Sequence, residues 1–306
     1  MPKALELSVI IPTYKRAQIL RHCLDALEKQ TVRDHIEVIV VSDGPDEKTA
    51  DMFLGLSWSF PIKHFAIPKA QQGVARNRAV EKASGKFVLL IGDDILLAPD
   101  ACEVHLHTHT NLQNPHRSSQ TKSEARSPKS EVPVAILGFT TWDPAVGITP
   151  VMRWLEETGW QFGYRKIAPF AHQFLPEKMQ HRFTYTSHLS LPIRVLRRIP
   201  FREDIMLYGW EDIEWGMRLR DRGIRLLYEP DARAFHHHHV EFADSLARME
   251  TLGRSVIHVS RLNLALDRRP RGWKLLLYHL LACVPGMRGT HTRAFLRGIR
   301  AARRSS

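Results

Sequence analysis

The sequence is poor in features that would place it outside the cell or inside a membrane. Only three of its 306 residues are cysteines, and they are widely separated: Cys23, Cys102 and Cys283. This odd, unpaired set argues against a disulfide framework or a thiolate zinc site and fits a reducing cytosol. The longest apolar run, residues 275–284, is too short for the ~18–20 residues that cross a bilayer. The first residues lack a secretory pattern, so we expect a cytoplasmic protein.

Acidic residues are missing from the C-terminal end of the chain. Ten of the 44 Lys and Arg residues, and none of the 32 acidic residues, lie between Arg268 and Ser306. The net charge of +12 therefore falls to +2 over the first 267 residues, and we expect no specific nucleic-acid partner. Because apolar residues such as Trp273 and Phe295 alternate with the arginines, two interpretations stay open. The segment fits an anionic membrane surface, or a helix packed on the body with a solvated basic face.

Two common phosphate-binding loops are also absent. No Walker loop occurs, and no Gly-x-Gly-x-x-Gly follows the first strand-like run, Leu7–Ile11. A protein that handles a diphosphate without such a loop commonly uses a divalent cation held by carboxylates. Asp93-Asp94, directly after another strand-like run, is the available substitute.

The first hundred residues alternate regularly between strand-like and helix-like segments. This alternation predicts an α/β fold with a mostly parallel sheet and helices on both faces. Ligands then bind at the carboxyl ends of the strands, where Thr13-Tyr14, Asp43 and Asp93-Asp94 fall. The expected strands are residues 7–11, 36–41, 62–67 and 86–91, and the expected helices are 19–27, 47–54 and 73–83.

A second pair of acids, Glu211-Asp212, stands at the start of a predicted helix. Either pair alone also fits a helix N-terminus, where acids complement the helix dipole. Together they supply a cation site and a proton acceptor, which the transfer of a sugar from a nucleotide requires. A carboxylate beside another carboxylate has a raised pKa, which favours a base that works near neutral pH. Glu214, one turn on, is expected to be solvated and outside the site.

Five ordered segments resemble the hallmark sequences of family-two inverting glycosyltransferases of the GT-A fold. The similarity covers roughly residues 5–265. It implies a Rossmann-like sheet, a nucleotide-diphosphate sugar donor, a saccharide or lipid-linked acceptor, and Mn²⁺ or Mg²⁺ as cofactor. It departs from the family pattern at Gly92, where the family usually has an acid. The segments are residues 7–14, 38–44, 73–77, 85–94 and 209–223.

The resemblance also implies roles for individual residues. Asp94 would bind the metal directly, and Asp93 would contact the ribose and the metal through water. Asp212 would be the catalytic base, while Glu211 and Trp210 would bind the acceptor. Arg76 would lie near the base or the pyrophosphate. The nucleotide-sugar site would comprise Pro12, Thr13, Tyr14, Asp43, Arg76 and Asp93.

Four consecutive histidines, His236–His239, follow a strand-like segment. Related transferases often complete the metal sphere with a histidine at this place, and Mn²⁺ accepts imidazole nitrogen beside carboxylate oxygen. Strand alternation lets His236 and His238 point one way and His237 the other. We therefore expect His236 first, and His238 second, as a metal ligand; an incidental run or a mobile loop stays open.

The expected organisation is one catalytic domain, residues 1–265, followed by a basic amphipathic helical tail, residues 266–306. Residues 1–110 would bind the nucleotide, and the polar insert 111–131 would be a surface loop or disordered. Residues 132–265 would bind the acceptor, with strands at 132–139 and 224–228 and aromatic residues that suit an acceptor-facing wall.

The expected function is inverting, metal-dependent glycosyl transfer in cell-envelope polysaccharide or glycolipid synthesis, at the inner face of the membrane. One alternative is a nucleotidyltransferase that makes sugar nucleotides, but Pro12–Arg16 lacks the glycines of its basic loop. The other is a non-catalytic membrane-surface adaptor that uses the tail, which leaves both acid pairs without a role. Nucleotide-sugar hydrolysis with and without Mn²⁺ or Mg²⁺ separates the three.

Overall fold

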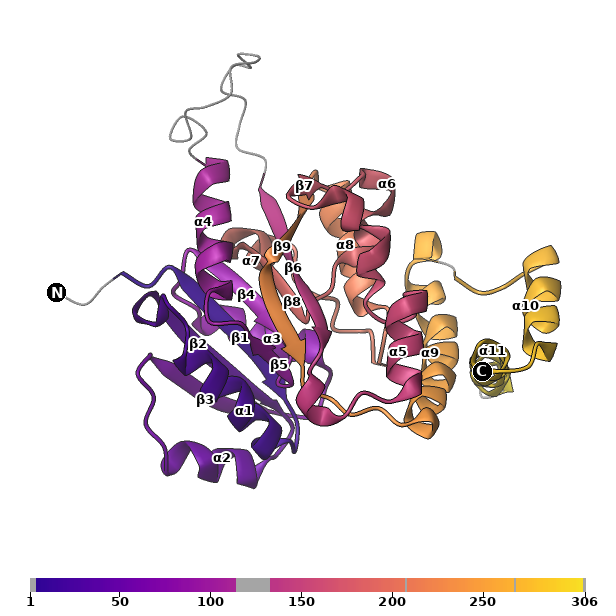
Figure 1. The fold of residues 1–306 in the computed structure, drawn as a ribbon, viewed down its shortest axis with the longest axis horizontal. Helices are drawn as coiled ribbons and strands as arrows, with labels where there is room; N and C mark the ends of the chain where they lie inside the picture. Colours follow the sequence, from indigo (N-terminus) through magenta and orange to yellow (C-terminus); the bar gives the residue numbers. More distant parts are fainter. Residues whose placement is uncertain (1–3, 114–132, 207, 267, 305–306) are drawn as a thin grey trace, which may run out of the picture.

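A computed structural model describes residues 4–113, 133–206, 208–266 and 268–304. Within these ranges nine strands form one mixed sheet, in the order β3-β2-β1-β4-β8-β6-β9-β5, with β7 paired to β9 (Figure 1). The strands are β1 Leu7–Thr13, β2 Ile36–Asp43, β3 Ile62–Ile67, β4 Phe87–Ile91, β5 Ile95–Leu97, β6 Val134–Trp142, β7 Gln173–Phe174, β8 His188–Pro192 and β9 Arg225–His236. The helices are α1 Ala17–Glu28, α2 Glu47–Leu54, α3 Gln72–Lys82, α4 Ala101–Gln113, α5 Pro150–Thr158, α6 Glu177–Gln180, α7 Ile193–Arg198, α8 Glu211–Asp221, α9 Phe242–Leu262, α10 Trp273–Cys283 and α11 Met287–Arg304.

Helices cover both faces of the sheet, as the alternation predicts. Strands β1 to β4 are mutually parallel, and β1 is buried along its whole length. One face packs against α1 and α4, and the other against α3, α5, α7 and α8. A right-handed crossover between parallel strands requires a helix on one face or the other, so this layering follows from the sequence pattern. The α/β fold class is confirmed.

The predicted strands and helices are present in both halves of the chain, but the structure also contains strands that were not predicted. Helix α2 and strand β3 occupy the predicted residues 47–54 and 62–67. Strand β8 runs antiparallel between β4 and β6, and the short strand β5 pairs with β9; neither was predicted. Strand β9 is longer than the expected residues 224–228, because a register shift opposite Gly138 and Phe139 lets it continue to His236.

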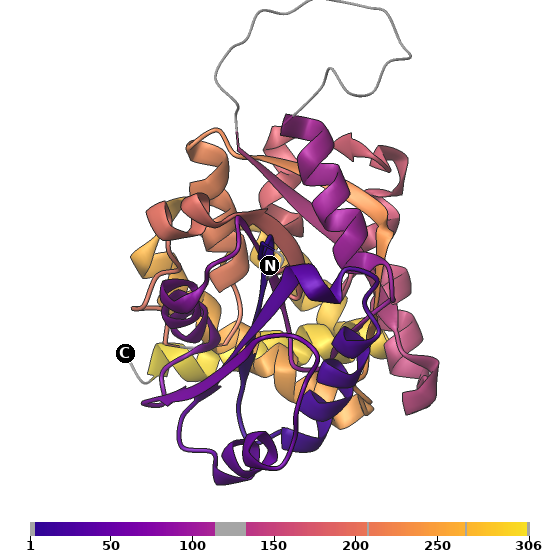
Figure 2. The ribbon, with the colours of Figure 1, turned by 90° about the vertical axis from the view of Figure 1, so that its left-hand side faces the viewer.

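The predicted tail forms two helices at the end of the molecule opposite α1 and α2 (Figure 1). Seen from the side of α1 and α2, the yellow C-terminal helices lie behind the sheet (Figure 2). Helix α11 packs along α9 with Phe295 and Ile299 buried. Gly253 and Gly298 allow this approach, since a Cβ on either would collide with the backbone of the opposite helix. For helix α11 the structure therefore agrees with the second of the two interpretations, a helix packed on the body of the protein.

Two further sequence expectations concern this part of the chain and the insert. The polar insert, residues 111–131, falls mostly outside the described residues; its first three residues extend α4. Among the described residues, no helix has both the length and the apolar character of a membrane span.

Buried histidines join α4 to β8 through a chain of hydrogen bonds. His109 Nε2 and His105 Nδ1 each lie 2.8 Å from Ser190 Oγ, and His105 Nε2 lies 3.1 Å from His188 Nε2. Burial lowers the pKa of all three rings, to about 3 for His109, to about 4 for His188, and well below the ordinary value for His105. The contact between α4 and the sheet therefore depends on neutral imidazoles.

We expect mild acid to destabilise the fold. Histidines of the unfolded chain take up protons near pH 6.5, whereas these rings stay neutral in the folded protein down to about pH 4, so stability falls as the pH drops below 6.5. By about pH 5 His109 and His188 each lower the free energy of unfolding by roughly 2 kcal/mol. Urea unfolding at about pH 7.5 and pH 5 measures the loss. His109→Gln should make this loss of stability smaller. The control is His107→Gln, on the exposed side of α4, which should leave the loss unchanged. Equal pH dependence of stability in the two variants would contradict the explanation.

Candidate active site

Polar groups gather where β1, β2 and β4 end. Thr13 Oγ1, at the end of β1, donates a 2.7 Å hydrogen bond to Asp93 Oδ2, after β4. Asp43, at the end of β2, accepts from Lys69 Nζ at 2.6 Å and from the Ala70 backbone N–H at 2.7 Å. Because β1 is paired in parallel with both β2 and β4, the three predicted clusters lie at one edge of the sheet.

An aromatic ring lies beside Asp43. Lys69 Nζ is 4.1 Å from the centroid of the Tyr14 ring, and Gly44, with φ +125°, lies against the same ring. A side chain at Gly44 would collide with Tyr14, so the glycine allows the ring and the carboxylate to share this edge. Pro12 is buried within β1 and paired with β2.

Asp94 and two histidines form a compact cluster at the end of β9. Asp94 Oδ2 lies 3.2 Å from His236 Nε2 and 3.3 Å from His238 Nδ1. One ligand atom from each of the three residues lies within 4.8 Å of the others. His237 turns away, with Nδ1 2.7 Å from Asp143 Oδ2. The side chains therefore alternate as the strand pattern predicts.

The cluster fits a divalent cation. One carboxylate oxygen and two imidazole nitrogens form a donor set that borderline metals such as Mn²⁺ accept. His236 Nδ1 is buried and has no hydrogen-bond partner among the described residues, so hydrogen bonding at that nitrogen does not account for the ring's position. Trp142 stacks on the ring, with centroids 5.1 Å apart, and fixes its orientation. The metal role of these residues stays a prediction.

Gly92, the departure from the family pattern, lies against Asp94. A Cβ built at this position would come within 2.8 Å of Asp94 Oδ1. Any side chain here would turn the Asp94 carboxylate away from its present position. The glycine at position 92 therefore leaves room for the position of the Asp94 carboxylate beside His236 and His238.

Arg16 is a member of the cluster that was not predicted. Its NH1 lies 2.8 Å from Asp93 Oδ1, and its NH2 lies 2.8 Å from Asp94 Oδ2. Burial raises the pKa of Asp93 to about 7, whereas for Asp94 the charges of His236 and Arg16 outweigh burial and hold its pKa well below the usual range. One sequence signal was available: a cation at the start of α1 opposes the helix dipole, so Arg16 needs an acidic partner elsewhere.

The second acid pair begins α8 and joins the same edge of the sheet. Gly209 and Trp210, with φ +92° and +73°, turn the chain into the helix. Glu211 Oε1 accepts a hydrogen bond from Gln72 Nε2, at the start of α3 and shortly after the end of β3. Burial, together with the charge of Glu211, raises the pKa of Asp212 to about 7. Asp212 therefore titrates near neutral pH, where a general base is most effective.

Arg76 lies near the acid pair. Its side chain is 2% exposed, and its NH2 makes one long hydrogen bond, 3.4 Å, to Thr186 O. Its Nε and NH1 have no hydrogen-bond partner within the described ranges. Burial lowers the pKa of Arg76 to about 10, against the opposing charges of Glu211 and Asp212. The unpaired N–H groups are suited to a ligand anion, and a pyrophosphate role stays a prediction.

Trp210 and Glu214 both make contacts within the protein around α8. The Trp210 indole N–H donates to Leu252 O at 3.1 Å and its ring packs on α9, so an acceptor contact through this ring stays a prediction. The expectation that Glu214 is solvated was wrong. Glu214 is 1% exposed and pairs with Arg218 at 3.0 Å, because the two residues are one turn apart on the same face of the helix.

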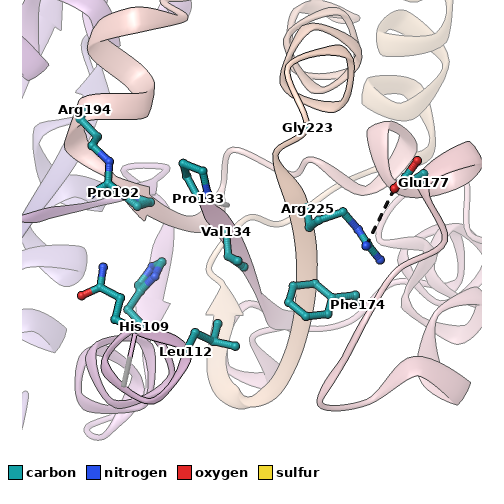
Figure 3. Close-up of a pocket in the computed structure, with 11 residues that line it drawn as sticks. His109, Leu112, Pro133, Val134, Phe174, Glu177, Pro192, Arg194, Gly223 and Arg225 are labelled. Carbon is teal, nitrogen blue, oxygen red and sulfur yellow. Dashed lines mark ion pairs between the residues drawn. The ribbon is translucent and has the colours of Figure 1, made fainter. Parts of the chain in front are cut away.

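One hollow adjoins the cluster at the end of β9, and another lies at the opposite ends of β6 and β9. One, of about 390 Å³, has an aromatic floor that includes Phe162, Tyr164 and Tyr228, with charged residues at its rim. Phe162 also packs edge-on against His236, with centroids 5.3 Å apart, so this hollow adjoins the cluster. The other, of about 470 Å³, lies where β6 and β9 begin and contains none of the predicted site residues (Figure 3).

Comparison with known proteins shows which families and structures this chain is similar to. Residues 8–114 match the family described as glycosyl transferase family 2. An uncharacterized glycosyltransferase, YfnE, of Bacillus subtilis is 25% identical over 260 residues, which cover 77% of this chain and 65% of the relative. Validoxylamine A glucosyltransferase of Streptomyces hygroscopicus is 28% identical over 237 residues, 71% of this chain and 52% of the relative. The chain thus matches less than two thirds of the length of these curated relatives.

Solved structures share the fold. The mannosyltransferase PcManGT of Pyrobaculum calidifontis, solved in complex with GDP-Man and Mn²⁺, aligns with a TM-score of 0.59. The alignment covers 99% of this chain and 88% of the mannosyltransferase at 14% identity, so it shows the fold alone. The matching family segment, the glycosyltransferase relatives and the shared GT-A architecture agree with one another, and the chain is similar to the family-two glycosyltransferases.

Proposed function

We propose that the protein is an inverting, metal-dependent glycosyltransferase that moves a sugar from a nucleotide diphosphate to an acceptor hydroxyl. One observation carries the proposal. Two acid sites with different chemistry meet at one edge of the sheet: Asp94 beside His236 and His238, and Asp212, whose pKa is raised to about 7. The first is equipped to hold a cation, and the second to accept a proton.

The proposed reaction is a single displacement. Asp212 takes the proton of the acceptor hydroxyl while its oxygen bonds to the anomeric carbon, and the bond from that carbon to the diphosphate oxygen breaks. The nucleoside diphosphate leaves with the bonding electrons. A cation held by Asp94 and the histidines would neutralise the charge that develops on the diphosphate. Attack opposite the leaving group inverts the anomeric configuration.

The proposed donor site uses the groups at the ends of β1 and β2. Tyr14 offers a ring face to a nucleobase, and Asp43 offers carboxylate oxygens to base or ribose hydrogen-bond donors. Asp93 would accept from a ribose hydroxyl. Support comes from the structural neighbour, which was solved with GDP-Man and Mn²⁺. The donor sugar and base of this chain are to be found with a panel of nucleotide sugars.

The proposed acceptor site is the 390 Å³ hollow beside His236. Its aromatic floor suits the apolar face of a sugar ring, and Arg153, Glu156 and Arg165 at its rim suit the hydroxyls. We assign it to a saccharide or lipid-linked acceptor. Release of nucleoside diphosphate from a panel of nucleotide sugars, with Mn²⁺, with Mg²⁺ and with EDTA, tests the proposed function. Metal-independent or absent turnover with every donor would contradict it.

We also propose that the enzyme acts at an anionic membrane surface in envelope polysaccharide or glycolipid synthesis. Helix α10 supports this proposal, because it exposes an apolar stripe at helical spacing. Trp273, Leu276 and Leu280 are 70%, 63% and 59% exposed, and Leu277 and Val284 extend the stripe. The exposed face of the neighbouring helix α11 carries Arg residues and no acid. Apolar insertion combined with basic charge is the pattern of an interfacial helix.

We expect Leu276→Gln with Leu280→Gln to release the protein from vesicles that contain anionic lipid. Removing the whole tail would also uncover α9, which α11 covers, so substitutions on α10 are the cleaner test. Sedimentation with vesicles at low and high salt measures binding, which should weaken as salt screens the bases. The matched control is Leu54→Gln, an 87% exposed residue on α2. Unchanged vesicle binding by the α10 variant would leave the stripe without a membrane role.

A further inference from the structure

Arg16 lies between the two carboxylates that the proposed function assigns to donor and metal, and the inference rests on that proposal. Its guanidinium spans both acids, with 2.8 Å contacts to Asp93 Oδ1 and Asp94 Oδ2. The same NH2 is 3.3 Å from His238 Nδ1. A protein cation therefore already contacts two of the three candidate metal ligands, Asp94 Oδ2 and His238 Nδ1.

Arg16 and a metal ion cannot both use His238 Nδ1. A neutral imidazole nitrogen has one lone pair, which either accepts an N–H or binds a metal. His238 Nδ1 faces both Arg16 NH2 and Asp94 Oδ2. A divalent ion here would also lie beside the fixed positive charge of the guanidinium, with little water to screen it, because Asp94 is 9% exposed. Arg16 must therefore move before a metal can bind all three residues of the cluster.

The surroundings allow the side chain to move while its backbone stays fixed. The Lys15 backbone N–H, next to Arg16, donates to Asp46 Oδ2 at 2.6 Å. Arg16 stands at the N-cap position of α1 without a capping hydrogen bond from its side chain. That side chain is 31% exposed, whereas those of Asp93 and Asp94 are 6% and 12% exposed. A planar guanidinium released from two carboxylates matches the oxygens of a diphosphate.

We propose that Arg16 is a displaceable internal cation that couples metal binding to donor binding. It neutralises Asp93 and Asp94, and it leaves them for the diphosphate of the donor when a divalent cation arrives. Each ligand then favours the other by the same factor, because a coupling free energy is reciprocal. The role of Arg16 is to position donor and metal, so its effects are visible in binding without turnover.

Calorimetric titration of Mn²⁺ into wild type, Arg16→Gln and Arg21→Gln tests this proposal. Arg21 is a matched control on the same helix, since it pairs with Asp25 at 2.8 Å. Without nucleotide, Arg16→Gln should bind Mn²⁺ roughly tenfold more tightly than wild type and Arg21→Gln do. A saturating nucleoside diphosphate, UDP or GDP, should raise the Mn²⁺ affinity of wild type about 5- to 150-fold, and that of Arg16→Gln much less. Arg16→Lys keeps one positive charge but cannot span both acids. Its Mn²⁺ affinity should lie between those of wild type and Arg16→Gln, and it replaces Arg16→Gln in the test if that variant does not fold.

Equal Mn²⁺ affinity of wild type and Arg16→Gln without nucleotide overturns the inference, and so does an unchanged nucleotide effect in Arg16→Gln. Failure of all three proteins to bind any nucleoside diphosphate, with or without Mn²⁺, counts instead against the proposed donor. The titration with metal alone decides the role of Arg16 in that case too.

Discussion

Asp212→Asn should lower glycosyl transfer by roughly 10²–10⁴-fold, the usual contribution of a general base, while donor binding survives. The amide keeps the shape of the side chain and cannot take a proton. Wild-type transfer should rise as the pH increases through about 7, because burial and the charge of Glu211 raise the pKa of Asp212 to about that value and only the ionised form is a base. The variant should lose this rise.

Asp221→Asn is the matched control, since Asp221 is exposed at the other end of α8. It should retain both activity and pH profile. Glu211→Gln should raise the acceptor KM as well as lower kcat, because its proposed role is to hold the acceptor hydroxyls. Its bond to Gln72 can persist with an amide.

Product stereochemistry, read by NMR, completes this test. Inversion at the anomeric carbon agrees with one displacement assisted by Asp212. Retention of configuration, or near-normal turnover by Asp212→Asn, would show that another group is the base.

The predictable part of the fold follows from local pattern. Buried parallel strands are mostly apolar runs that end in polar residues, so β1, β2 and β4 could be located from sequence. Because the carboxyl ends of parallel strands share an edge, the grouping of Thr13, Asp43 and Asp93 was predictable as well. Strand β8 could not be predicted in this way. It runs antiparallel between β4 and β6, and no local signal specifies which strands it joins.

The same limit applies to the site. The alternation of His236 and His238 is a property of one segment and was predictable. The approach of Arg16 to Asp93 and Asp94 joins residues 77 and 78 positions apart, and only the assembled sheet brings them together. Arg76 shows a similar limit: its place in α3 was clear, but its burial beside Glu211 and Asp212 depends on how α8 packs.

Asp94→Ala should abolish metal-dependent nucleotide binding and leave the fold largely intact. Asp94 Oδ2 is the atom that His236, His238 and Arg16 all approach, so its loss removes the centre of the cluster. Losing a group that only orients a metal ligand typically costs about 10–100-fold in affinity, and a direct ligand should cost roughly 100-fold or more. Asp93→Ala should cost less, because its proposed partner is the ribose, and Thr13 remains to bind there.

Nucleotide affinity measured in Mn²⁺ and in EDTA isolates the metal-dependent part. The two conditions should give the same weak affinity for Asp94→Ala and different affinities for wild type and for Asp25→Ala, an exposed acid on α1 that serves as control. Thermal unfolding without metal checks the fold of each protein. Full nucleotide affinity of Asp94→Ala in Mn²⁺ would mean that the cation, if one is used, is held elsewhere. Because Asp94→Ala also frees Arg16 from one of its two acids, a gain in metal-independent nucleotide binding would show that Arg16 had turned to the diphosphate.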